Sequence, residues 1–189
     1  DDSMWLIDLV ENLLSVTRIE EGRMQIRQSA ELVDEVIREA LKHTGQSRTG
    51  RTIKVEEEDE LILAKMDARL IVQVLINLIG NAVKYTPQGT DITVRVRKEK
   101  AENGENSQVI ISVCDLGDGI PDDRKERVFD MFYTGGNQVA DSRRSLGLGL
   151  GLCRSIINAH GGKIWISDNI PHGAVVTFTL PAEEVALNE

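Results

Sequence analysis

Three short motifs, met in a fixed order along the chain, constrain its fold more than any other feature. The first places Asn77, Asn81 and Lys84 on one face of a single predicted helix. The second is the turn at 115–120, which follows a predicted strand, and the third is the glycine-rich segment at 147–152, which opens a later helix. Short glycine motifs match by chance and need the right structural context. In this order, the three together indicate a nucleotide pocket.

The polar face of the first helix suits phosphate and a hard cation. At about 100° per residue, an arc of about 80° holds four side chains: Gln73, Asn77, Asn81 and Lys84. An Asn carbonyl oxygen is a suitable ligand for Mg²⁺, and a Lys offers a point charge to phosphate oxygens. A solvated helix face is the alternative, but two Asn residues in mid-helix cost stability without a local gain. We therefore favour a binding role.

The turn after the second strand can aim a carboxylate into the pocket. Asp115 ends the strand, and Gly117 and Gly119 let a ligand approach the backbone. A carboxylate there can accept a hydrogen bond from the amino group of adenine. Taken alone, the segment is as well explained by an ordinary turn, since Asp and Gly dominate turns.

The third motif has the form of a phosphate cradle. Gly147, Gly149 and Gly151 alternate with leucines, so backbone N–H groups at a helix start can face phosphate while the leucines enter the core. The motif lacks the Gly-Lys-Ser/Thr ending of a P-loop, and its late position does not suit the first turn of a Rossmann fold. Both of those nucleotide folds are set aside.

Composition narrows the class of protein. The 189 residues, 41% of them hydrophobic, suffice for one compact domain and a helical appendage. A net charge of −9 disfavours nucleic acid as a partner. Cys114 and Cys153 lack the spacing of a disulfide framework or metal clip, which indicates buried free thiols in a reducing cytosol. No apolar run approaches the roughly 18 residues of a membrane helix, so we expect a soluble piece of a longer protein, with any membrane attachment outside it.

Periodicity predicts alternating helices and strands around these motifs. A helix at 4–20 has an apolar seam, typical of a dimer or interdomain helix, or alternatively of a cap on the core. Five consecutive acidic residues at 56–60 indicate a solvated loop. The other expected elements are strands at 24–27, 52–55, 91–97, 109–114, 163–167 and 174–180, and helices at 31–43, 66–85 and 148–159.

The segment at 115–146 has little periodicity beyond a short helical candidate at 124–132, which is typical of a functional lid. Phe129 and Phe132 would anchor this lid or else form a satellite of the core. Arg143 and Arg144 are interpreted as a solvated pair.

These motifs resemble the ATP-binding domain of bacterial sensor histidine kinases, in the superfamily shared with gyrase, Hsp90 and MutL. Residues 77–87 resemble the N box, 115–120 the G1 box, 128–132 the F box and 147–152 the G2 box. Residues 160–162 and 177–181 fit the family's ending, and 13–22 resembles the second helix of a dimerisation hairpin. The stretches 129–136 and 142–147 further resemble the potassium-responsive Kdp-type kinases.

The resemblance implies a binding site for ATP and Mg²⁺. Asn81 would hold Mg²⁺, Asn77 and Lys84 would lie near the phosphates, Tyr85 would border the nucleotide, and Asp115 would read adenine. The other positions expected to contact ATP are Gly117, Gly119, Ile120, Gly147, Gly149, Leu150, Gly151 and Thr177.

The fold implied is an α/β (α+β) two-layer sandwich of the Bergerat type, with helices on one face of a mixed sheet. We expect a dimerisation remnant at 1–22, the catalytic ATP-binding domain at 23–183 and a tail at 184–189. The activity implied is transfer of the ATP γ-phosphoryl group to a His on a dimerisation helix. The expected partners are those helices, a response regulator and, in the full-length protein, a second copy of the chain. The resemblance also implies that the full-length protein is attached to the membrane, with this domain in the cytoplasm.

One departure from the family pattern concerns the phosphoacceptor. The family's acceptor His precedes an acidic residue, whereas His43, His160 and His172 precede Thr or Gly, so all three are interpreted as structural. No catalytic side chain is assigned, and the chain should bind ATP without phosphorylating itself. A regulatory nucleotide-binding module and a gyrase-type ATPase are the alternatives. The ATPase is disfavoured because no Asp or Glu lies between Ala68 and Asp91 to serve as a base.

Overall fold

The computed structural model describes residues 26–44, 52–58, 61–100, 107–130 and 148–183, together with Val10 and Leu14, which are helical and exposed. The predicted helix at 4–20 otherwise lies outside the described residues, as do Gly147, residues 131–146 of the predicted lid and the tail at 184–189.

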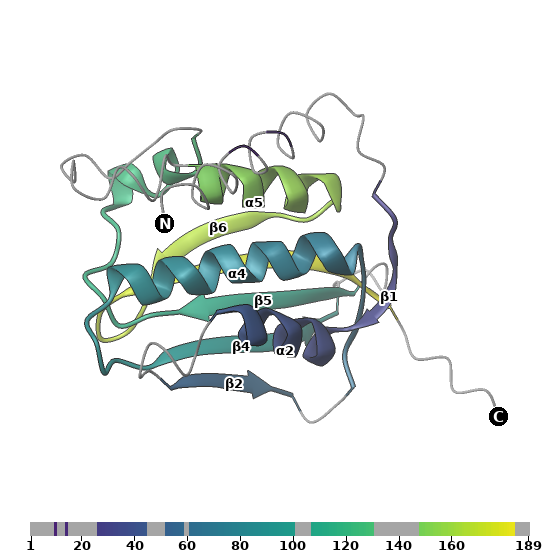
Figure 1. The fold of residues 1–189 in the computed structure, drawn as a ribbon, viewed down its shortest axis with the longest axis horizontal. Helices are drawn as coiled ribbons and strands as arrows, with labels where there is room; N and C mark the ends of the chain where they lie inside the picture. The colour runs from purple at the N-terminus through teal and green to yellow at the C-terminus, as the bar shows by residue number, and fades with distance from the viewer. Residues whose placement is uncertain are drawn as a thin grey trace.

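The described chain forms two layers, with helices covering one face of a sheet (Figure 1). Helix α4 lies between α2 and α5 and packs against both. The helices are α2 (Val33–His43), α4 (Ala68–Tyr85) and α5 (Leu148–Ala159), with short 3₁₀ turns η1 (Asp122–Arg124) and η2 (Arg127–Phe129). The strands are β1 (Ser29–Leu32), β2 (Ile53–Glu57), β3 (Leu63–Met66), β4 (Ile92–Glu99), β5 (Gln108–Cys114), β6 (Ile164–Asp168) and β7 (Ala174–Glu183).

The seven strands follow the order β1-β3-β7-β5-β4-β2, and β6 pairs with β7 beside this path. Strand β2 runs parallel to β4, and the remaining pairs are antiparallel. The sheet is therefore mixed, and the predicted two-layer sandwich is confirmed. None of the described helices is both long and apolar enough to cross a bilayer.

Burial explains why α4 is the central helix. Its apolar residues recur at helical spacing and are buried on the sheet, which leaves its polar stripe facing away. The buried residues of α4 are Leu70, Ile71, Val74, Leu75, Leu78, Ile79 and Ala82. On the sheet, β7 supplies Phe178 and Leu180 to the same core. The longest described helix, α4, and the longest described strand, β7, therefore line the hydrophobic core from its two layers.

The structure corrects four element predictions. No strand occupies Ile26 and Arg27, and the strand begins instead at Ser29, so the next helix begins at Val33 rather than 31. Strand β3 was not predicted at all. The acidic run is exposed over 56–58 as expected, but its first two residues belong to β2 rather than to a loop. The helix predicted from 124 is replaced by the two short 3₁₀ turns η1 and η2.

A buried histidine fixes the first turn of α4 to the end of α5. The Asp67 backbone N–H donates to His160 Nε2 at 3.0 Å, and His160 Nδ1 donates to the Ile156 carbonyl at 2.7 Å. Both bonds require the neutral ring with its proton on Nδ1. Burial lowers the pKa of His160 below its ordinary value of 6.5, against the raising effects of the Ile156 hydrogen bond and the Asp67 charge. The expectation that His160 is structural is confirmed.

The stability of the domain should therefore depend on the charge of His160. In the unfolded chain His160 takes up a proton near pH 6.5, whereas in the folded chain it does so only at a lower pH. The contribution of the neutral ring to the unfolding free energy is therefore fully present above pH 6.5 and decreases as the pH falls toward the lowered folded pKa. The variant His160→Gln should lose roughly 1–3 kcal/mol of unfolding free energy at neutral pH. It should also lose less stability than wild type on acidification to about pH 5.5.

Urea unfolding at both pH values measures this difference. The exposed His43, whose Nε2 lies 3.3 Å from Glu39 Oε1, supplies the control His43→Gln. Equal pH dependence in wild type and His160→Gln would show that another group is responsible.

Candidate nucleotide-binding site

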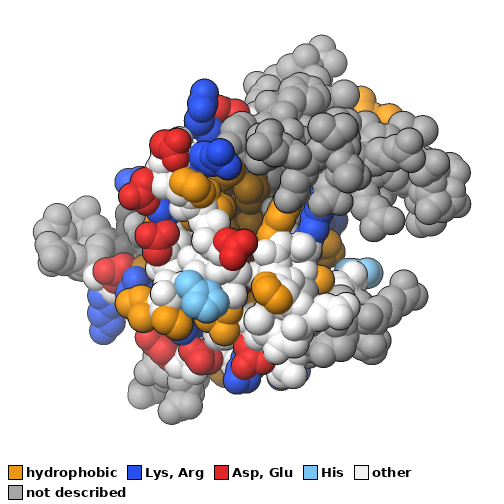
Figure 2. Space-filling view, turned by 90° about the vertical axis from the view of Figure 1, so that its left-hand side faces the viewer, with side chains coloured by type: hydrophobic (Ala, Val, Ile, Leu, Met, Phe, Trp, Pro, Cys, Tyr) orange, Lys and Arg blue, Asp and Glu red, His pale blue; other side chains and the backbone are white. Residues whose placement is uncertain are grey.

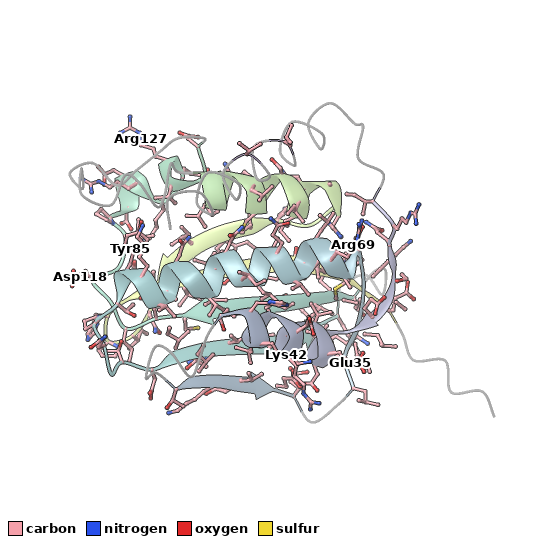
Figure 3. All side chains as sticks on the ribbon, in the orientation of Figure 1. Glu35, Lys42, Arg69, Tyr85, Asp118 and Arg127 are labelled. Carbon is pink, nitrogen blue, oxygen red and sulfur yellow. The ribbon has the colours of Figure 1, made fainter. Side chains whose placement is uncertain are left out.

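Several of the predicted site residues lie at one end of the domain. The carboxyl end of α4, the turn at 115–120 and the loop between β6 and β7 meet there. In Figure 3, Tyr85 and Asp118 lie at this end, whereas Arg69 marks the opposite end of α4. Three segments that are distant in sequence therefore surround one place.

The Asp115 carboxylate is held by one of its two oxygens. Oδ1 accepts the backbone N–H groups of Gly117 and Ala174, each at 3.0 Å. Within the described part of the chain, no hydrogen bond to Oδ2 is present. The carboxylate thus has one oxygen fixed by the protein and one available to a ligand donor, as reading of an amino group requires.

Gly117 joins this turn to the end of α4. A Cβ built on Gly117 would lie 3.0 Å from both the Tyr85 carbonyl oxygen and the Thr86 Cγ2. Thr86 is itself tied to the helix, because its hydroxyl donates to the Ala82 carbonyl at 2.6 Å. The glycine was predicted to admit a ligand, but it serves first to let the turn pack against α4.

Asn77 carries the clearest sign of a missing partner. Its Nδ2 is buried and meets no acceptor with good hydrogen-bond geometry among the described residues, although the Cys153 thiol is close enough for the Asn77 side chain to oppose the rise that burial causes in its pKa. An unsatisfied buried amide costs about 1–3 kcal/mol, so its presence calls for an explanation. The Asn77 Cγ lies 4.0 Å from the position of a Cβ on Gly149, which places the amide beside the first turn of α5.

The neighbouring positions complete the polar face of α4. Asn81 follows Asn77 by one turn and is partly exposed. The Lys84 ammonium lies 5.1 Å from the centre of the Tyr85 ring, which is 51% exposed. An exposed aromatic ring beside a cation offers a surface to a base or ribose.

The next predicted residues lie at the start of α5 and in the turn at 115–120. Gly149, Leu150 and Gly151 belong to the first turn of α5, and Leu150 packs against the core. Ile120 also packs against the core, and Gly119 adopts a φ of 76°. These residues shape the walls of the site by backbone position.

Thr177 does not join the others. It alternates along β7 with Val176 and Phe178, which pack in the core, so its side chain points to the face of the sheet away from the helices. There its hydroxyl lies 2.9 Å from the Ser112 hydroxyl. The structure therefore separates Thr177 from the rest of the predicted set.

A buried thiol lies next to Asn77 in the described part of the chain. Cys153 is buried behind Asn77, where burial raises the pKa of its thiol to about 12 against the lowering effect of the Asn77 side chain. No group of three or more His, Cys, Asp or Glu that could hold a metal occurs in the described ranges. The site can bind and orient a ligand, and any Mg²⁺ would need oxygens from that ligand as well as from Asn81.

Sequence reasoning missed two groups of residues that support the site. Asn169 and His172 in the β6–β7 loop contact the backbone of the Asp115 turn. Arg154 of α5 lies 4.5 Å from the Phe129 ring centre and pairs with Glu126 at 2.8 Å, which holds η2 against α5. Neither group shows a periodic signal, because each contact depends on the folded arrangement.

The surface at this end combines two kinds of side chain. Figure 2 shows it with acidic and hydrophobic side chains exposed side by side and basic ones mostly toward the edge. Ile170 is 89% exposed in the β6–β7 loop. Part of this surface is therefore apolar enough to border a ring system.

Gly173 should tolerate no side chain. It has a φ of 112°, and a Cβ there would lie 2.0 Å from the Asp115 carbonyl oxygen. We expect Gly173→Ala to lower the unfolding free energy by about 3 kcal/mol or more, since backbone strain and a backbone clash combine. Gly161→Ala is the matched control, because Gly161 also has a positive φ of 75° but nothing within 4 Å, and it should cost only about 1 kcal/mol. Denaturant unfolding of both variants measures the difference, and equal losses would contradict the clash.

Comparison with protein families agrees with this geometry. The family model described as "Histidine kinase-, DNA gyrase B-, and HSP90-like ATPase" matches residues 66–184. Sensor protein KdpD of Clostridium acetobutylicum is 41% identical over 183 residues, which cover 97% of this chain. The chain spans only 20% of that relative's length.

Solved structures show the same fold. Full-length ShkA in complex with AMPPNP superposes with a TM-score of 0.78 at 24% identity, over 98% of this chain and 37% of that one. Histidine kinase ThkA in complex with the response regulator protein TrrA gives a TM-score of 0.70 at 28% identity, over 94% of this chain and 49% of that one.

Proposed function

Because the chain belongs to the family of histidine kinase-, DNA gyrase B- and HSP90-like ATPases, we propose that it is the ATP-binding catalytic domain of a sensor histidine kinase. The observation that carries the proposal is the Asp115 carboxylate, which has Oδ1 saturated by two backbone N–H groups and Oδ2 left for a ligand. That arrangement fits the amino group of adenine, which is a donor.

The phosphates would lie between α4 and the start of α5. The buried Asn77 Nδ2 needs an acceptor, and the first turn of α5, beside it, has backbone N–H groups without intrahelical partners. Lys84 adds positive charge on the same face of α4. Asn81 would contribute its carbonyl oxygen to Mg²⁺, which supplies further neutralisation of the phosphate charge when bound.

In the proposed reaction, a ring nitrogen of an acceptor histidine attacks the γ-phosphorus. A P–N bond forms, the bond from the γ-phosphorus to the β–γ bridging oxygen breaks, ADP leaves, and the imidazole releases the proton of its other ring nitrogen to solvent. This chain's residues would bind and orient ATP and neutralise charge, which is most of what phosphoryl transfer demands. His160 is unsuited as acceptor because both its ring nitrogens are engaged and it is buried. The acceptor is therefore proposed to lie on a dimerisation helix outside residues 1–189.

The remaining assignments follow from the relatives and stay proposals. The ThkA complex with TrrA supports a response regulator as partner, and the similarity to a protein named sensor protein KdpD supports a role in signal sensing. We further propose that the full-length kinase is a dimer attached to the membrane with this domain in the cytoplasm, and that its signal is connected with potassium. A regulatory module that binds nucleotide without transferring phosphate is the second candidate, because the described side chains of the site are suited to hold and orient a ligand. Hydrolysis of the gyrase type is disfavoured, because α4 carries no acidic residue.

Calorimetric titration with ATP tests the site. Asp115→Asn keeps an oxygen for the two backbone donors but can place an NH₂ group against the adenine amino group, so ATP affinity should fall roughly ten- to a hundredfold. Asn81→Ala should reduce the effect of Mg²⁺ on that affinity. Asp118→Asn, an exposed change in the same turn, is the matched control and should leave binding unchanged. Wild-type affinity in Asp115→Asn would contradict the adenine assignment.

Phosphotransfer separates the kinase from the regulatory module. A dimerisation segment bearing its acceptor histidine, supplied separately with ATP labelled at the γ-phosphate and Mg²⁺, should become labelled on that histidine. Label should be absent when the acceptor is changed to Ala and strongly reduced with Asp115→Asn. A wild-type domain that binds ATP but never labels the segment would support the regulatory module.

A further inference from the structure

We propose that Asn169 and His172, in the loop between β6 and β7, are positioning residues that set the direction of the Asp115 carboxylate and thereby the preference for adenine. The inference rests on the proposed function of Asp115. It adds a group of residues that do not touch the nucleotide themselves.

Asn169 holds the carbonyl group of Asp115. Its Nδ2 donates to the Asp115 carbonyl oxygen at 2.7 Å, the shorter of the two bonds that this loop makes to the backbone of the turn. The amide is fixed in this orientation because its Oδ1 accepts the Ile170 N–H at 2.9 Å. A backbone bond of 3.0 Å from Asn169 N–H to the Gly173 carbonyl closes the loop on itself.

His172 holds the other side of the same turn. Its Nδ1 lies 3.0 Å from the Gly117 carbonyl oxygen and must donate, since a carbonyl only accepts. The two loop side chains thus bind the carbonyl groups of Asp115 and Gly117, while the carboxylate of the first accepts the N–H of the second. Asn169 and His172 therefore hold the turn through its two carbonyl groups, and Ala174 holds it through the Asp115 N–H and carboxylate.

The close approach of Gly173 leaves the turn no freedom to move toward the loop. The carbonyl of Asp115 lies against Gly173, where a Cβ would be 2.0 Å away. The next residue, Ala174, donates its N–H to Asp115 Oδ1 and accepts the Asp115 N–H at 2.9 Å through its carbonyl. The loop and the start of β7 therefore fix the position of Asp115 Oδ1 and of the Asp115 main chain. With these fixed, the direction of Oδ2 is fixed as well.

The loop is itself anchored to the segment that follows the turn. Lys125, only 17% exposed, pairs with Asp168 at 2.9 Å and also with Asp122. Asp168 is the last residue of β6 and precedes Asn169. Both carboxylates are exposed, so these ion pairs fix the direction of the loop more than they add stability. The loop and the segment 115–125 are thus joined at both ends.

Comparison of ATP with purine riboside triphosphate, which lacks the adenine amino group, tests the inference by calorimetry. In wild type, the ratio of the affinities for ATP and for the analogue measures the hydrogen bond from the adenine amino group to Asp115 Oδ2. In Asn169→Ala the turn loses its shortest tie to the loop, so ATP affinity should fall roughly five- to tenfold while affinity for the analogue stays nearly constant. His172→Ala should act in the same direction.

The matched control is Asn158→Ala, an exposed asparagine near the end of α5 that makes no contact with the turn. Amide hydrogen exchange without nucleotide gives a second readout, because the Gly117 and Ala174 N–H groups should exchange faster in Asn169→Ala if the carboxylate loses its orientation. Should Asn169→Ala fail to fold, His172→Ala decides by both measurements.

Two results would overturn the inference, and they differ. If wild type binds ATP and the folded loop variants keep both the wild-type preference over the analogue and slow exchange at Gly117 and Ala174, the loop has only a stabilising role and the proposed function stands. If folded wild type binds neither nucleotide, the proposed function fails and the inference fails with it.

Discussion

The site depends on the fixed position of α4 over the sheet. At its start, the Asp67 amide is bonded to His160 at the end of α5. At its end, Gly117 allows the strand-end turn to lie against the last carbonyl groups of the helix. Between these two points, Asn77 meets the first turn of α5. A shift of α4 along its axis would break the contacts at both ends, so the polar face and the Asp115 carboxylate keep their relative place without a ligand.

The elements that were predicted correctly have a sequence pattern that matches the way they pack in the fold. Helices α4 and α5 were predicted to within two residues because their apolar positions repeat at helical spacing and face the core. Strands β5 and β7 are rich in Val, Ile and Thr, which favour extended backbone. The motif residues Asn77, Asn81 and Asp115 were placed correctly on a helix and at a strand end because each is attached to one of these well-specified elements.

The parts that were missed owe their form to distant partners. Strands β1 and β3 consist of Ser-Ala-Glu-Leu and Leu-Ala-Lys-Met, and neither contains a β-branched residue. They are strands because β3 pairs with β1 on one side and with the end of β7 on the other. Asn169 and His172 likewise carry no periodic signal, since their bonds to the turn exist only once β5 and β7 pair. Thr177 shows the converse error, because a motif does not say to which face of a strand a side chain points.

The burial of Cys153 has a practical consequence for spectroscopy. The thiolate is the form that reacts with alkylating labels, and a thiol whose pKa is raised to about 12 supplies almost none at neutral pH. Cys114 is also buried, and burial likewise raises its pKa. A single cysteine introduced at an exposed position such as Ile170 should therefore take up a fluorophore or spin label selectively, with both native thiols left in place.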